Sequence, residues 1–92
     1  MNVKDITFIR MGFYESGIQT IKDLLAENGH DVLASLIESR QFAGANGFWS
    51  VRLSVTDWET VSDAFLEHGN DAWEASIAAE IDDRLRNHGW RH

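Results

Sequence analysis

The sequence predicts a small α+β domain in which a two-stranded antiparallel sheet is covered by helices, in the order β-α-α-β-α-α. Residues Phe48–Thr56 alternate apolar and polar side chains, which is typical of a strand with one buried and one wet face. Elsewhere apolar residues recur at helical spacing, and glycines at 29, 69 and 89 stand where three helices should end. With 92 residues, 43% of them hydrophobic, we expect a single domain over residues 1–92.

The remaining elements follow from local composition. Residues Asp5–Met11 are rich in β-branched and aromatic side chains and predict the first strand, with apolar residues on both faces. Glycine and asparagine predict a loop over Phe42–Phe48. The expected helices span about Ser16–Asn28, Val32–Gln41, Asp57–His68 and Asp71–Asn87.

Polar residues mark the expected helix starts. Asp31 is expected to cap the second helix, and Asn70 or Asp71 the fourth, because a side-chain oxygen at that position accepts a hydrogen bond from a free backbone N–H. Thr56 and Glu59 have the spacing of a capping box, which predicts that the third helix starts directly after Thr56.

The four tryptophans fall into two groups. Trp49, Trp58 and Trp73 lie on apolar stripes and are predicted to be core residues. Trp90 follows the last helix, where it either folds back onto the core or is exposed as a binding anchor.

Composition and motifs argue against several classes of function. The chain has no cysteine, so it has no disulfide, thiolate metal site or thiol nucleophile. It also lacks a nucleophile elbow, a phosphate-binding glycine loop and metal-ligand spacing, so we predict no enzyme activity, cofactor or metal. No segment reads as a membrane span or a signal peptide, and a cytoplasmic location is therefore expected.

The net charge of −7 predicts an acidic surface. An acidic surface repels phosphate, and the helix–glycine–helix junctions lack the basic residues of a DNA-reading helix, so direct nucleic-acid binding is not predicted. Three carboxylates at i, i+4 and i+8 form an acidic row, although like charges at this spacing work against the helix and the row also resembles an ordinary solvated face. The candidate partner-binding residues are Glu59, Asp63, Glu67, Asp71, Glu74, Asp82, Asp83 and Trp90.

These features favour a non-enzymatic binding protein that inhibits a basic, nucleic-acid-handling protein or nucleoprotein complex by presenting carboxylates where phosphates would sit. Phage-type anti-CRISPR and anti-restriction proteins and toxin-immunity proteins share this size and acidity, but no motif links the chain to them. Two alternatives stay open. One is a self-associating module that forms a homodimer through strand edges or tryptophans, and the other is a small ligand-binding domain or enzyme with a site that spacing does not reveal.

Overall fold

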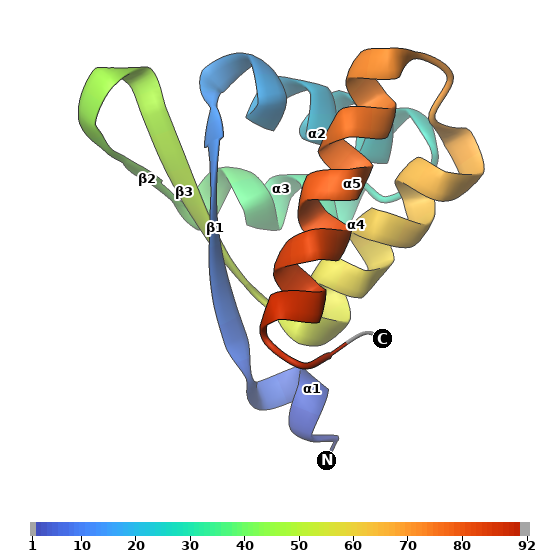
Figure 1. Cartoon of the computed structure of the whole chain (residues 1–92). Helices are drawn as coiled ribbons and strands as arrows, with labels where there is room; N and C mark the ends of the chain where they lie inside the picture. Colours follow the sequence, from blue (N-terminus) through green and yellow to red (C-terminus); the bar gives the residue numbers. More distant parts are fainter. Residues whose placement is uncertain (1, 91–92) are drawn as a thin grey trace.

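The computed structural model describes residues 2–90 and shows a three-stranded antiparallel sheet of order β1-β3-β2 (Figure 1). β3 is therefore the central strand, and β1 and β2 are the edges. In chain order the elements are α1 (Val3–Ile6), β1 (Phe8–Tyr14), α2 (Glu15–Glu27), α3 (Asp31–Ser39), β2 (Gln41–Ala43), the 3-10 turn η1 (Ala45–Gly47), β3 (Phe48–Ser54), α4 (Val55–His68) and α5 (Ala72–Asn87).

The predicted α+β class is confirmed, but the sheet has three strands in place of two. The additional strand, β2, takes Gln41 from the end of a predicted helix, which stops at Ser39, and Phe42 and Ala43 from the predicted loop; it pairs with β3 over only three residues. The first strand begins at Phe8 rather than Asp5, because the residues before it form the short helix α1. Asn2 caps α1 by accepting a hydrogen bond from the backbone N–H of Lys4 at 3.0 Å.

β3 is the strand that the alternation predicted, and its buried face is confirmed. Val51 and Leu53 are buried, Trp49 packs partly buried against the core, and Val55 continues the same face as the first residue of α4. Alternate residues of β1 bury on the same side of the sheet. One face of the sheet therefore forms the floor of the hydrophobic core.

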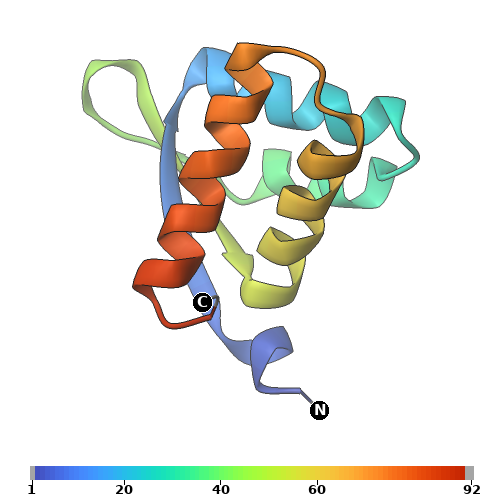
Figure 2. The same ribbon diagram turned by 45° about the vertical axis from the view of Figure 1, so that its right-hand side comes forward.

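Helices α2 to α5 lie on this buried side of the sheet (Figures 1 and 2). Trp58 of α4 is 0% exposed, and its indole N–H donates a hydrogen bond to the backbone carbonyl of Ile9 in β1 at 2.9 Å. Within residues 2–90, no helix covers the opposite face of the sheet, and none is long and apolar enough to cross a membrane.

The start of α4 differs from the predicted capping box. Ser54 is the cap, and its hydroxyl oxygen accepts a hydrogen bond from the backbone N–H of Asp57 at 3.1 Å. The helix therefore begins at Val55, earlier than predicted. Thr56 already lies in the first turn and donates its hydroxyl to the carboxylate of Asp5 at 2.6 Å. Ser54 and Asp57 have the same spacing as Thr56 and Glu59, and the structure uses the earlier hydroxyl as the cap, with the buried Val55 as the first helical residue.

The other helix ends follow the predictions more closely. Asp71 caps α5, accepting a hydrogen bond from a backbone N–H of the first turn at 2.8 Å. Gly29 and Gly89 have φ of 84° and 80°, the left-handed conformation expected just after a helix. Gly69 follows α4 with φ of −69°, so it ends that helix without the left-handed conformation. Asp31 is the first residue of α3 and makes no side-chain cap.

The tryptophan predictions are corrected at one position. Trp58 is a core residue as predicted, but Trp73 is 48% exposed. It lies in the first turn of α5, where its indole N–H donates to the hydroxyl of Thr20 at 2.9 Å instead of entering the core. Trp90 is half-buried and packs against the core, so it folds back rather than standing free as an anchor.

Candidate functional site on the outer face of the sheet

The face of the sheet that carries no helix presents arginines and aromatic rings. Its residues are the members of β1 and β3 that alternate with the buried ones, joined by residues in and just before β2. The four rings have exposed fractions between 38% and 62%. We call this surface the outer sheet face and define it by Phe8, Arg10, Tyr14, Arg40, Phe42, Phe48 and Arg52.

Three arginines form one row across β1, β3 and the residue just before β2. Arg10 lies opposite Arg52 in the β1–β3 pair. On the other side of β3, the backbone N–H of Arg52 donates to the carbonyl of Arg40 at 3.3 Å, so Arg40 extends the row. Like charges at directly opposed strand positions destabilise a sheet. This row is therefore not explained by the needs of folding.

Aromatic rings hold the guanidinium groups at the surface. The Cζ atoms of Arg52 and Arg40 lie 4.8 and 5.8 Å from the ring centroid of Phe8, and that of Arg10 lies 5.1 Å from the centroid of Phe42. Each such contact contributes about 0.5–1 kcal/mol at an exposed site and offsets part of the repulsion. Among residues 2–90, none of the three arginines forms an ion pair with a carboxylate; Arg10 and Arg52 are exposed and Arg40 is partly exposed.

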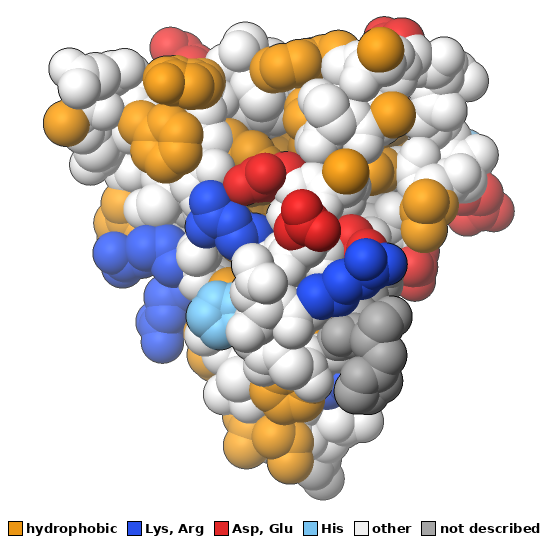
Figure 3. All heavy atoms as spheres, viewed as in Figure 1, with side chains coloured by type: hydrophobic (Ala, Val, Ile, Leu, Met, Phe, Trp, Pro, Cys, Tyr) orange, Lys and Arg blue, Asp and Glu red, His pale blue; other side chains and the backbone are white. Residues whose placement is uncertain are grey.

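Figure 3 views the molecule with the sheet at its left side, where blue and orange side chains gather. Gly12 lies between Arg10 and Tyr14 on the outer sheet face, and a Cβ atom there would fall on the ring of Phe48. The absence of a side chain thus lets this ring lie on the backbone. Tyr14 meets the same ring edge-on, with centroids 5.1 Å apart and an interplanar angle of 85°. The two rings are thus positioned before any partner binds, which lowers the entropic cost of binding.

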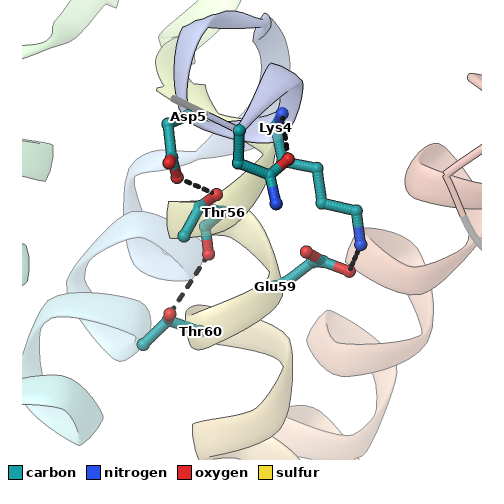
Figure 4. Close-up of polar contacts among 6 residues, drawn as sticks. Lys4, Asp5, Thr56, Glu59 and Thr60 are labelled. Carbon is teal, nitrogen blue, oxygen red and sulfur yellow. Dashed lines mark hydrogen bonds and ion pairs between the residues drawn. The ribbon is translucent and has the colours of Figure 1, made fainter.

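The predicted acidic row is present on α4 and consists of Glu59, Asp63 and Glu67. Its first member has a structural role, because the Nζ atom of Lys4 lies 3.2 Å from the Glu59 carboxylate (Figure 4). Together with the hydrogen bond between Thr56 and Asp5, this ion pair ties α1 to the start of α4. Asp63 and Glu67 are exposed further along the helix.

The other predicted acidic residues belong to the cap and the body of α5. Asp71 caps the helix, and Glu74 accepts a hydrogen bond from the backbone N–H of the residue before Asp71 at 3.0 Å. Asp82 pairs with Arg86 at 2.9 Å, and Asp83 is exposed. Most of the predicted acidic residues are therefore engaged within the fold, including Glu67, whose carboxylate lies 3.8 Å from Nε2 of His68, and the structure does not gather the set into one site.

The outer sheet face was missed although part of its signal is visible in the sequence. Phe8, Arg10 and Arg52 fall at wet or mixed positions of the two predicted strands, but Phe42 lies in a predicted loop. Tyr14 likewise lies beyond the predicted end of the first strand at Met11, although it is the last residue of β1. Without the register between strands, nothing connects these residues.

The described residues contain no group of three or more His, Asp or Glu side chains arranged to hold a metal ion. No protein-family model matches the chain, and neither the curated proteins nor the solved structures contain a significant match to it.

Proposed function

We propose that this protein binds single-stranded nucleic acid through the outer sheet face. The observation that supports the proposal is the arginine row, Arg10–Arg52–Arg40, with exposed rings on both sides of it in a chain of net charge −7. Proteins that bind single strands combine cations for the phosphates with aromatic rings on which the bases stack. Phe8 flanks the row on one side, and Phe42 flanks it on the other.

A single strand fits this surface better than a duplex. The bases of a duplex stack on one another and are not free to stack on side chains, whereas unpaired bases can lie flat on exposed rings. The row crosses two inter-strand spacings, about 10 Å. Its three guanidinium groups can neutralise about three phosphates, so the surface is matched to a short segment of a few nucleotides, near the lower end of the range for single-strand sites.

The overall acidity is compatible with this proposal, which departs from the expectation drawn from net charge. Electrostatic interactions at physiological salt are screened beyond about 8 Å, so a strand on the sheet experiences mainly the nearby arginines. The acidic residues Asp63 and Glu67 belong to α4, which packs on the covered side of the sheet. They would repel a strand from that helix and favour its approach to the outer sheet face.

The salt dependence of binding tests the proposal. Fluorescence anisotropy with a labelled eight-nucleotide thymidine strand should give a log–log slope against salt of about −2, since each phosphate neutralised on a single strand contributes about −0.7. Arg52→Gln should weaken binding and make the slope shallower by about 0.7. Lys22→Gln, which removes the same charge from α2 on the covered side, should change neither quantity.

Two results would overturn the proposal. One is failure of any single strand to bind at low salt, and the other is equal loss of affinity in Arg52→Gln and Lys22→Gln. The inhibitor hypothesis, in which the acidic row blocks a basic partner, stays a separate prediction. Glu59 is paired with Lys4, so in the inhibitor hypothesis the basic partner would contact Asp63 and Glu67. These two carboxylates lie on α4, which would repel nucleic acid.

A further inference from the structure

A hollow adjoins the outer sheet face between the end of β1 and α5, which lines it from Trp73 to Arg84. Its volume is about 320 Å³, which is at the small end of the range for ligand pockets. Tyr14 and Phe48 line it from the sheet, and Trp73 lines it from α5. Two of its aromatic walls therefore belong to the outer sheet face as well, so the two surfaces are continuous.

Trp73 is placed in this wall by a specific contact. Its ring is half exposed, and the hydrogen bond from its indole N–H to Thr20 fixes the ring against α2. An exposed tryptophan held in this way gains little from burial. A flat ring that is fixed and accessible is, however, well suited to stack on a planar ligand.

Polar groups with spare hydrogen-bonding capacity lie among the residues that line the hollow. Arg84 donates a hydrogen bond from Nε to Oε1 of Glu80 at 3.2 Å, and its Nη2 atom lies 3.0 Å from the same oxygen in an ion pair. Among residues 2–90, neither the second carboxylate oxygen of Glu80 nor the Nη1 group of Arg84 forms a hydrogen bond of its own. The pair thus presents a strong acceptor beside strong donors, in a hollow that is also lined by aromatic rings.

Guanine matches this arrangement. Its adjacent N1–H and N2–H groups can donate hydrogen bonds to a carboxylate, and its neighbouring O6 atom can accept a hydrogen bond from a guanidinium group. Extruded bases are recognised in the same general way, by stacking on aromatic side chains and by hydrogen bonds to one edge. We propose, building on the proposed function, that the hollow binds one unpaired base of the bound strand and prefers guanine.

The test compares eight-nucleotide strands that differ at one position. A single guanine among thymidines should raise the affinity about tenfold over the all-thymidine strand, and adenine or cytosine at that position should raise it less. Glu80→Gln and Arg84→Gln should each remove the guanine preference while retaining affinity for the all-thymidine strand. Arg86→Gln is the matched control, because Arg86 lies on the same helix in an ion pair of the same spacing with Asp82 but does not line this hollow.

The outcomes separate the two proposals. A guanine preference that disappears in Glu80→Gln and persists in Arg86→Gln supports the base site. Binding of every strand with equal affinity, or a preference that survives both Glu80→Gln and Arg84→Gln, overturns the base site and leaves single-strand binding intact. Failure of all strands to bind overturns single-strand binding and the base site with it.

Discussion

Replacing Phe42 and Phe48 together by alanine is expected to weaken binding of an eight-nucleotide strand by roughly 30-fold or more. Each base stacked on an aromatic side chain contributes about 1–3 kcal/mol to the binding free energy. The losses from the two substitutions add if the two rings stack on different bases. Both rings are partly exposed, so the variant should melt close to the parent temperature. Fluorescence anisotropy measures the affinity, and thermal melting by circular dichroism checks the fold.

A matched control removes apolar side chains from the helical side of the molecule. Val32 and Leu66 are 85% and 73% exposed, on α3 and α4. The double variant Val32→Ala with Leu66→Ala should bind the strand as tightly as the parent. If the Phe42 and Phe48 variant kept the parent affinity, or if both double variants lost it equally, base stacking on the outer sheet face would be excluded.

Trp58→Ala is expected to lower the free energy of unfolding by about 3–5 kcal/mol, as large-to-small changes of buried aromatic residues do. The ring is 0% exposed, its centroid lies 6.3 Å from that of Phe13, and it supplies a hydrogen bond to the carbonyl of Ile9. The change removes packing and leaves a buried acceptor without its donor. For a domain this small, the loss is a large fraction of its stability, and urea denaturation followed by circular dichroism measures it.

Two substitutions by phenylalanine serve as comparisons for the loss of stability in Trp58→Ala. Trp58→Phe keeps much of the ring volume but removes the donor to Ile9, so an intermediate loss is expected. Trp73→Phe alters a half-exposed ring and should cost much less. The packing account is contradicted if Trp58→Ala unfolds at the same urea concentration as the parent.

The sequence predicted the helices and the central strand because their signals are local. Residues 48–54 alternate strictly enough to place β3, and the apolar residues of each long helix repeat at 3.6-residue spacing. β2 has no such signal, because three residues cannot show a period and its pairing with β3 is a tertiary contact. The start of β1 was misplaced because Asn2 caps a helical turn over residues that also favour strands.

The outer sheet face could not be assembled from spacing alone. Arg10, Arg40 and Arg52 are far apart in the chain and meet only through the register of three strands. The net charge of −7 also gives no sign of the outer sheet face, because it sums the arginines of the row with the more numerous carboxylates of the rest of the chain. By contrast, the acidic row on α4 follows from helical spacing, but the pairing of Glu59 with Lys4 depends on where α1 docks. Local sequence patterns therefore predict the helices and the central strand, whereas the residues of the outer sheet face are brought together by the pairing register of the strands.

The most direct test of the account is to map the binding surface by two-dimensional amide NMR during titration with an unlabelled eight-nucleotide strand. The account predicts that the amide shifts concentrate on β1, β3 and β2, around Arg10, Arg52 and Phe42, and extend to the hollow at Trp73. The chemical shifts of the Asp63 and Glu67 amides on α4 should not change. Shifts centred on α4, or no shifts at saturating strand concentration, would contradict the assignment of the outer sheet face as the binding site.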